Sequence, residues 1–188
     1  MNIVYIITGV VAFCLFLVYD INSIKGNSKI LKSMFFTGVL LLAAATGLLL
    51  ISEWKTGSFS VIRTAGFMIV ALVFLILLVY TLFFALPFTE TYISDSGKPK
   101  VCMTGVYGMC RHPGFLWFLG MYACFALAIP TSAVIWGSAI FCLCNLVYII
   151  VQDKWTFPNF FDDYNHYKEV VPFLIPNRNS IREGIRTL

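Results

Sequence analysis

One short segment of the chain holds the residues best suited to bind an anion. It runs from Thr104 to Pro113 and ends in Arg111, His112 and Pro113. Because proline is favoured in the first turn of a helix, Arg111 and His112 are expected at a helix N-terminus. The helix dipole and the free backbone N–H groups there favour an anion, and an arginine beside them suits a carboxylate or a phosphate. The alternative is that Arg111 only adds positive charge to one membrane face while His112 caps the helix.

A second group of polar and aromatic residues lies further along the chain. Gln152 and Asp153 come directly after a long apolar run. Beyond them, large apolar side chains recur at intervals of four, three and four positions: Phe160, Tyr164, Tyr167 and Val171. This spacing predicts one face of a helix, which Pro172 ends. An amphipathic helix lying on a membrane surface would show the same pattern without any ligand, and His166 would then face water.

The elements that position these groups are expected to be membrane helices. Of the 188 residues, 60% are apolar and 12% are charged, and the mean hydropathy is +0.87. Soluble domains carry about 25% charged residues, so this chain cannot cover its surface with polar groups. Apolar runs that approach the roughly 20 residues needed to cross a bilayer span residues 3–19, 34–51, 65–86, 113–129 and 133–151. We therefore predict a single all-α domain over residues 1–188, a polytopic integral membrane protein with about five transmembrane helices and a C-terminal cytosolic or interfacial helix.

The placement of lysine and arginine predicts how these helices are oriented. With the C-terminus in the cytosol, eleven of the 13 basic residues fall on the cytosolic side: Lys25, Lys29, Lys32, Lys98, Lys100, Arg111, Lys154, Lys168, Arg178, Arg182 and Arg186. Lys55 and Arg63 fall on the other side, so the positive-inside rule places the N-terminus outside and the C-terminus in the cytosol. The chemistry is then expected in the cytosolic segments, about residues 87–112 and 152–188.

The same sequence disfavours several classes of function. The net charge of +4 is small and scattered, which does not indicate a nucleic-acid partner. The six cysteines lie mostly within apolar runs and lack metal-ligand partners, so neither a disulfide framework nor a metal site is predicted. Ion-coupled transporters usually keep acids or bases at mid-membrane depth, and this chain has almost none there.

Both groups of residues resemble the motifs of one family. The first reads Thr104-Gly105-x-Tyr107-x-x-x-Arg111-His112-Pro113. The second reads Phe160-x-x-x-Tyr164-x-x-Tyr167-x-x-x-Val171-Pro172-x-x-Ile175-Pro176 and follows after an apolar hairpin. In this order they resemble the isoprenylcysteine carboxyl methyltransferase family, integral membrane enzymes that use S-adenosylmethionine and are related to the phospholipid N-methyltransferases. The resemblance covers residues 101–176, and the first three apolar runs match no motif of the family.

The resemblance implies a cofactor, a substrate class and a set of site residues. The cofactor would be S-adenosylmethionine, and the acceptor would be lipophilic, such as the carboxylate of a prenylated or similar lipid-like molecule. Residues 98–113 and 152–176 would form the cytosolic cofactor region. The implied catalytic residues are Arg111, Gln152 and Asp153. The implied cofactor-binding residues are Val101, Thr104, Gly105, Tyr107, Arg111, His112, Pro113, Gln152, Tyr164 and Tyr167.

Each of these residues has an implied role. Arg111 and the helix start at His112 and Pro113 would hold the carboxylate end of the cofactor. Tyr107 and a strand-like segment over residues 101–105 would line its nucleoside. Gln152 and Asp153 would face the amino group of the cofactor or the acceptor, and the tyrosines of the second motif, Tyr164 and Tyr167, would close the pocket against the membrane surface. Membrane lipids are the expected surroundings, and the sequence does not indicate an oligomeric state.

The chain also departs from the family pattern at several positions. Phe115 and Trp117 stand where the family usually has tyrosine and glycine, and Phe161 replaces a glycine. Gln152 and Asp153 stand where the family usually has two glutamates. A changed acceptor and a non-catalytic member that binds lipid or a partner protein are therefore open alternatives. A third alternative is an NADPH-dependent sterol or enone reductase of related fold, although the basic cluster expected for its 2′-phosphate is thin.

Overall fold

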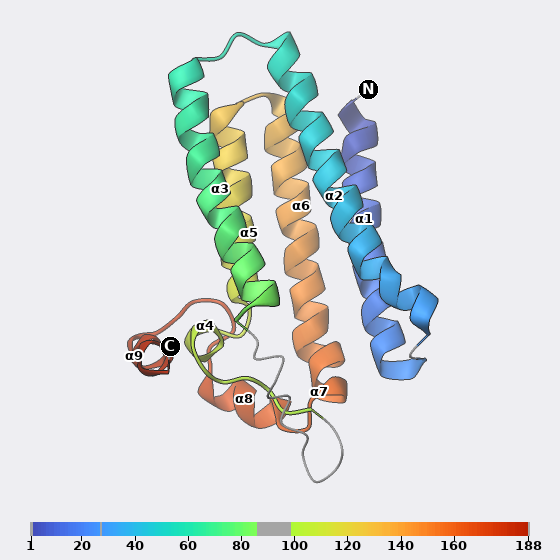
Figure 1. Ribbon diagram of the computed structural model, residues 1–188, viewed down its shortest axis with the longest axis vertical. Coiled ribbons are helices and arrows are strands. Elements are labelled where there is room, and N and C mark those ends of the chain that lie inside the picture. The colour runs from blue at the N-terminus through green and yellow to red at the C-terminus, as the bar shows by residue number, and fades with distance from the viewer. Residues whose placement is uncertain (1, 27, 86–98, 188) are drawn as a thin grey trace.

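The computed structural model describes residues 2–26, 28–85 and 99–187, and within these ranges every regular element is a helix (Figure 1). The prediction of an all-α chain is therefore confirmed. Helical stretches that are long and apolar enough to cross a membrane are α1 (Asn2–Lys25), α2 (Lys29–Thr56), α3 (Val61–Phe83) and a continuous helix Ser132–Phe160, which begins with α6 (Ser132–Val151).

The fifth predicted span corresponds to a shorter helix. This helix is α5 (Pro113–Ala128), which is apolar and has 16 residues. At 1.5 Å per residue it rises about 24 Å, less than the roughly 30 Å of a hydrocarbon core. By length and composition the structure thus supports four spans, and the count of five stays a prediction.

The short elements gather at one end of the bundle. They are α4 (Val106–Met109), the π-helix η1 (Gln152–Thr156), α7 (Phe157–Phe160), α8 (Tyr164–Val170) and α9 (Arg178–Arg186). Figure 1 shows the labelled short helices below the long ones, at the end where α1 turns into α2. The N-terminus and the α2–α3 and α5–α6 connections lie at the opposite end. The two motif segments, distant in sequence, are therefore neighbours in space.

Several helices extend beyond their predicted ends, and at two of these ends polar residues find partners. α1 continues past residue 19 to Lys25, and its buried Asn22 exchanges two hydrogen bonds with the backbone of Ser28, at 3.0 and 2.9 Å. α3 starts at Val61, since Ser60 caps it by accepting the N–H of Arg63. α3 ends at Phe83, short of the predicted end; residue 86 itself and the predicted cytosolic residues 87–98 lie outside the described residues.

The prediction of one helix over the Phe160–Val171 face is wrong. The chain leaves the helical conformation at Phe161, and α8 starts anew at Tyr164. The two aspartates at positions 162 and 163 favour such a turn, and the Asp163 carboxylate accepts the Val101 N–H at 2.9 Å. Phe160 is consequently outside the aromatic face of α8, which packs against the loop before α4 rather than lying open on a surface.

The centre of the bundle is aromatic, whereas its outer faces are aliphatic. Phe13, Phe118 and Phe141 are buried where α1, α5 and α6 meet. α3 buries only Ala71 and Thr81 of its 23 residues. Most of its large apolar side chains remain exposed, as they do on the outer face of α2. Exposed apolar surface on this scale marks a membrane-facing surface.

Candidate functional site

Arg111 connects the two motif segments. It lies between α4 and α5, and its Nε donates to Asp153 Oδ1 at 2.8 Å, while Nη2 lies 3.4 Å from Oδ2. Its Nη1 donates to the carbonyls of Lys168 and Val171 at 2.9 and 2.8 Å. The two charged side chains are 10% and 12% exposed. The guanidinium therefore joins η1 to the end of α8 in a largely dry environment, where such charge-assisted bonds are strong.

His112 occupies the N-cap position of α5 but does not cap the helix with its side chain. The ring instead places Nε2 3.4 Å from Asp153 Oδ1 and stacks on Phe157, with Phe173 at its edge. Because a carboxylate only accepts hydrogen bonds, Nε2 carries the proton. Burial lowers the pKa of His112 and outweighs the opposing effect of the Asp153 charge, so the ring is neutral at neutral pH.

The tyrosines of the motifs are buried and bonded to the protein. The Tyr164 hydroxyl donates to Asp153 Oδ1 at 2.8 Å, and burial followed by that contact raises the pKa of Tyr164. The Tyr167 hydroxyl donates to the Tyr107 carbonyl at 2.6 Å, and the Tyr107 hydroxyl donates to the Thr81 carbonyl at 2.9 Å. The tyrosines therefore tie α8 to α4 and α3. Tyr164 and Tyr167 are each 2% exposed, and their expected role in closing a pocket against the membrane surface stays a prediction.

Gln152 and Asp153, which were expected to act together, are the first two residues of a π-helical turn and have different partners. Pro158 lacks an N–H, and its ring crowds the carbonyl four residues earlier, so the helix widens over η1, Gln152–Thr156. Asp153 then faces Arg111, whereas Gln152 turns towards α1. The prediction that Gln152 and Asp153 face one ligand therefore does not match the described geometry.

Gln152 belongs to a second polar cluster, which the sequence analysis missed. At its centre lies Asp20 of α1, which is 4% exposed. Its Oδ1 accepts the Tyr148 hydroxyl at 3.1 Å, and its Oδ2 accepts Gln152 Nε2 at 3.1 Å and the Thr156 hydroxyl at 3.3 Å. The only indication in the sequence was Asp20, an acidic residue directly after the first apolar run. Such a residue is equally typical of the end of a membrane helix.

The other expected site residues lie around the same end of the bundle. Val101 and Thr104 belong to an irregular segment, so the expected strand-like structure over residues 101–105 is not a strand. Gly105 adopts φ 58°, a left-handed conformation that favours glycine, and starts α4. Pro113 is the buried first residue of α5. Trp117 Nε1 donates to the Thr81 hydroxyl at 3.0 Å, so Trp117 contacts the same threonine as Tyr107.

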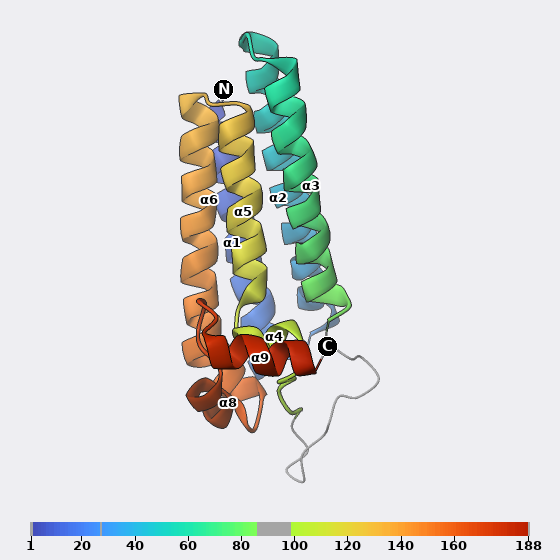
Figure 2. The ribbon, with the colours of Figure 1, turned by 90° about the vertical axis from the view of Figure 1, so that its left-hand side faces the viewer.

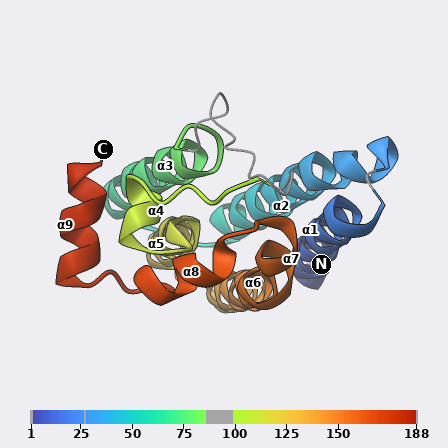
Figure 3. The ribbon, with the colours of Figure 1, turned by 90° about the horizontal axis from the view of Figure 1, so that it is seen from below.

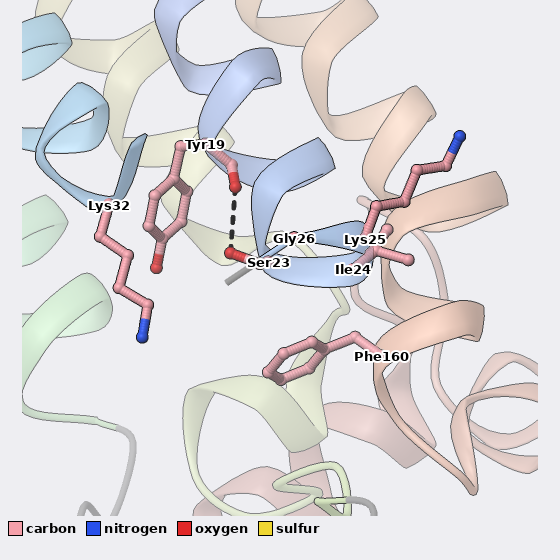
Figure 4. Close-up of a pocket in the computed structure, with 7 residues that line it drawn as sticks. All are labelled: Tyr19, Ser23, Ile24, Lys25, Gly26, Lys32 and Phe160. Carbon is pink, nitrogen blue, oxygen red and sulfur yellow. Dashed lines mark hydrogen bonds between the residues drawn. The ribbon is translucent and has the colours of Figure 1, made fainter. Parts of the chain in front are cut away.

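One described cavity lies beside α1, and neither Arg111 nor Asp153 lines it. It has a volume of about 470 Å³ and lies between the end of α1, the start of α2 and α7. Figure 4 shows the side chains of Tyr19, Lys32 and Phe160 directed towards one space, while Lys25 turns away. The Lys25 ammonium instead lies 5.9 Å from the centre of the Trp155 ring. The cavity thus combines apolar walls with the Lys32 ammonium group, for which the described residues supply no partner.

Metal and thiol chemistry find little support in the part of the chain that the structure describes. No group of three or more histidine, cysteine or acidic side chains that could hold a metal occurs there. Cys110 is next to Arg111, but burial raises the pKa of its thiol to about 11, so it stays protonated and is a poor nucleophile.

Comparison of the chain with protein-family models, curated proteins and solved structures gave no match. The family resemblance of the two motifs therefore stays a prediction.

Proposed function

We propose that this chain is a membrane-embedded methyltransferase that moves a methyl group from S-adenosylmethionine to a lipophilic acceptor. One observation carries the proposal: in a buried cluster, Arg111 of the first motif binds Asp153, which also accepts the hydroxyl of Tyr164 from the second motif. The cluster lies at the end of an apolar bundle, where a water-soluble cofactor and a membrane-borne acceptor can meet. A π-turn at such a position is also common at functional sites.

The proposed orientation places this cluster on the cytosolic side. Two basic residues, Lys55 and Arg63, belong to the helix ends opposite the cluster. The other described basic residues belong to elements at the cluster end. The positive-inside rule then supports an N-terminus outside and a C-terminus in the cytosol.

The charges of the cluster fit the amino-acid end of the proposed cofactor. That end carries a carboxylate and an ammonium group, and Arg111 and Asp153 offer the complementary charges. In this structure the two side chains bind each other, so binding requires an exchange in which Arg111 takes the carboxylate and Asp153 the ammonium. The Arg111 Nη2 to Asp153 Oδ2 contact, at 3.4 Å, is the weaker of the two and the first that can yield. Tyr164 keeps Asp153 in place through its hydroxyl.

The buried surroundings suit transfer to a carboxylate acceptor. When bound, the cofactor supplies an electrophilic methyl group on a cationic sulfonium. His112 and Tyr164 exclude water from the cluster, since they are 6% and 2% exposed. Water stabilises separated ions more than the transition state in which their charges cancel, so a dry site lowers the barrier. Transfer to a carboxylate needs no base. An amine acceptor would need a base to remove its proton, and the neutral His112 ring is a better base than Asp153, because Asp153 is already paired with Arg111.

The cavity beside α1 offers a place for the polar end of the acceptor. Lys32 supplies a cation and Tyr19 a hydroxyl, while Ile24 and Phe160 supply apolar walls. This combination suits an anionic head group on an apolar chain.

One observation favours the non-catalytic alternative. The polar groups of Arg111, Tyr107, Tyr164 and Tyr167 are all bonded within the chain. No buried side-chain nitrogen or oxygen among the described residues lacks a partner. A cluster that is satisfied in this way could serve only to hold the C-terminal segment in place on a lipid- or partner-binding protein.

Calorimetric titration of the detergent-solubilised protein with S-adenosylhomocysteine tests the proposal. The wild type should bind, and Asp153→Asn should weaken binding about tenfold or more, because a charge-assisted bond to the ammonium is lost. Arg63→Gln, at the opposite end of the bundle, should bind as the wild type does. No binding by the wild type, in a preparation that unfolds cooperatively, would overturn the proposal and favour the non-catalytic alternative.

A further inference from the structure

The C-terminal helix α9 lies across the end of the bundle, crosswise to the long helices (Figure 2). Its start is fixed by a capping box: the Asn177 side chain accepts the Ser180 N–H at 2.8 Å, and the Ser180 hydroxyl accepts the Asn177 N–H at 3.0 Å. The predicted C-terminal helix covers residues 160–171, so α9, which lies beyond it, was not expected. Seen from below, α9 lies at one edge of the bundle beside α4 (Figure 3).

One face of α9 is docked on the first motif. Ser180 and Gly184 are buried, and a Cβ on Gly184 would lie 2.8 Å from the carbonyl oxygen of Gly105. The Gly105 N–H donates to the Thr187 hydroxyl at 2.9 Å. Gly108 faces the same contact, since a Cβ there would lie 3.4 Å from the Gly184 Cα. The position of α9 is thus coupled to the loop that precedes Arg111.

The remaining faces of α9 are exposed and carry a separate pattern. Arg178, Arg182 and Arg186 are spaced four residues apart and form a stripe along the helix. Ile181 and Ile185, 40% and 60% exposed, lie between this stripe and the docked face. The single ion pair of these arginines within the described ranges joins Arg186 to Glu183 at 3.9 Å, with both side chains mostly exposed. The helix therefore offers unneutralised positive charge beside apolar side chains.

We propose that α9 binds the anionic phospholipid head groups of the bilayer that surrounds the bundle. A helix lying in the membrane plane buries apolar side chains at the acyl boundary and keeps basic ones at head-group level. The exposed Ile181 and Ile185 suit the first role, and the arginine stripe suits the second. Charge complementarity selects anionic over neutral lipid. The proposal depends on the chain being in a bilayer, and it does not depend on methyl transfer.

A consequence for the site follows from the docking of α9. Lipid that binds the docked helix stabilises the docked state by mass action. Because Gly184 and Thr187 contact Gly105, that state also holds the first motif loop in place. Anionic lipid should therefore order residues 105–109 as well as α9.

Hydrogen exchange of the full chain in lipid nanodiscs tests this inference. Discs of phosphatidylcholine are compared with discs in which about a third of the lipid is phosphatidylglycerol. Each arginine near an anionic surface adds about a fivefold stabilisation, so exchange in α9 should slow by up to about a hundredfold, with a smaller effect at residues 105–109. High salt should remove the difference by screening. The variant with Arg178→Gln, Arg182→Gln and Arg186→Gln should also lose it, whereas Arg63→Gln should keep it.

Each other outcome overturns the inference in a defined way. Equal slowing in the triple variant and the wild type would show that the arginines do not recognise the lipid. The same slowing by millimolar inorganic phosphate in neutral discs would identify a site for a free anion instead of a membrane contact. Unchanged exchange in α1, α2 and α6 of the triple variant is the control for folding. Since the readout is exchange, a failure here leaves the proposed methyl transfer untouched.

Discussion

The ion pair between Arg111 and Asp153 allows a quantitative prediction. Exposed ion pairs contribute about 0–1 kcal/mol, but these side chains are only 10% and 12% exposed. Removing one partner of a buried pair destabilises a protein by about 3–5 kcal/mol. Asp153→Asn keeps the size and one acceptor oxygen, so we expect a slightly smaller loss of about 2–4 kcal/mol in the free energy of unfolding.

A double-mutant cycle separates the pair from its surroundings. Arg111→Met, Asp153→Asn and the double variant are unfolded reversibly in mixed micelles, and the coupling energy between the two positions should be about 2 kcal/mol or more. The matched control is Glu183→Gln, because the Glu183–Arg186 pair is exposed and 3.9 Å apart; that variant should change stability by less than about 0.5 kcal/mol. If Asp153→Asn were no more destabilising than Glu183→Gln, the pair would not hold the two motifs together.

Three further predictions concern His112, Asp20 and Gly184. Burial lowers the pKa of His112, so below pH 6.5, its ordinary value, the unfolded chain takes up a proton that the folded chain refuses. Stability should therefore fall as pH falls through this region, by up to about 1.4 kcal/mol per pH unit, and the same titration of His112→Gln should show a shallower slope. Asp20→Ala removes the acceptor of three buried hydrogen bonds and should cost about 2–4 kcal/mol in the unfolding assay; a loss below about 0.5 kcal/mol would mean that the cluster is not formed. Gly184→Ala forces α9 away from α4 and should destabilise the chain by about 1–3 kcal/mol. The control is Gly47→Ala, where a Cβ meets nothing within 4 Å and no destabilisation is expected. Equal thermal shifts for the two variants would contradict the docking of α9.

The long helices could be predicted from the sequence because runs of apolar residues have few other solutions in lipid. Their ends were less predictable. Asp20 and Asn22 look like the end of a span, yet both lie within α1 and are buried, with partners outside this helix at Gln152 and Ser28. In the same way, the break after Phe160 depends on a contact between Asp163 and Val101, which local periodicity does not reveal.

The candidate site was predicted in part. The spacing before Pro113 correctly placed Arg111 at a helix start, and the second motif lies beside it as expected. Gln152 and Asp153 have different partners because neighbouring residues on a helix do not face each other, but which partner each one finds, Asp20 or Arg111, is set by tertiary packing. The contact of Gln152 with Asp20 joins residues 132 positions apart, and α9 is too short and too polar to stand out by hydropathy. These features come from tertiary packing, and no local pattern could have indicated them.

The central claim is that the Arg111–Asp153 cluster serves methyl transfer, and transfer of label tests it most directly. Vesicles that contain the protein are incubated with methyl-labelled S-adenosylmethionine, and the label is measured in the lipid extract. The account predicts labelled lipid with the wild type and with Arg63→Gln. With Asp153→Asn it predicts a loss of about a hundredfold, since the variant mispositions the cofactor. No label with the folded wild type, or equal labelling by Asp153→Asn, would contradict it.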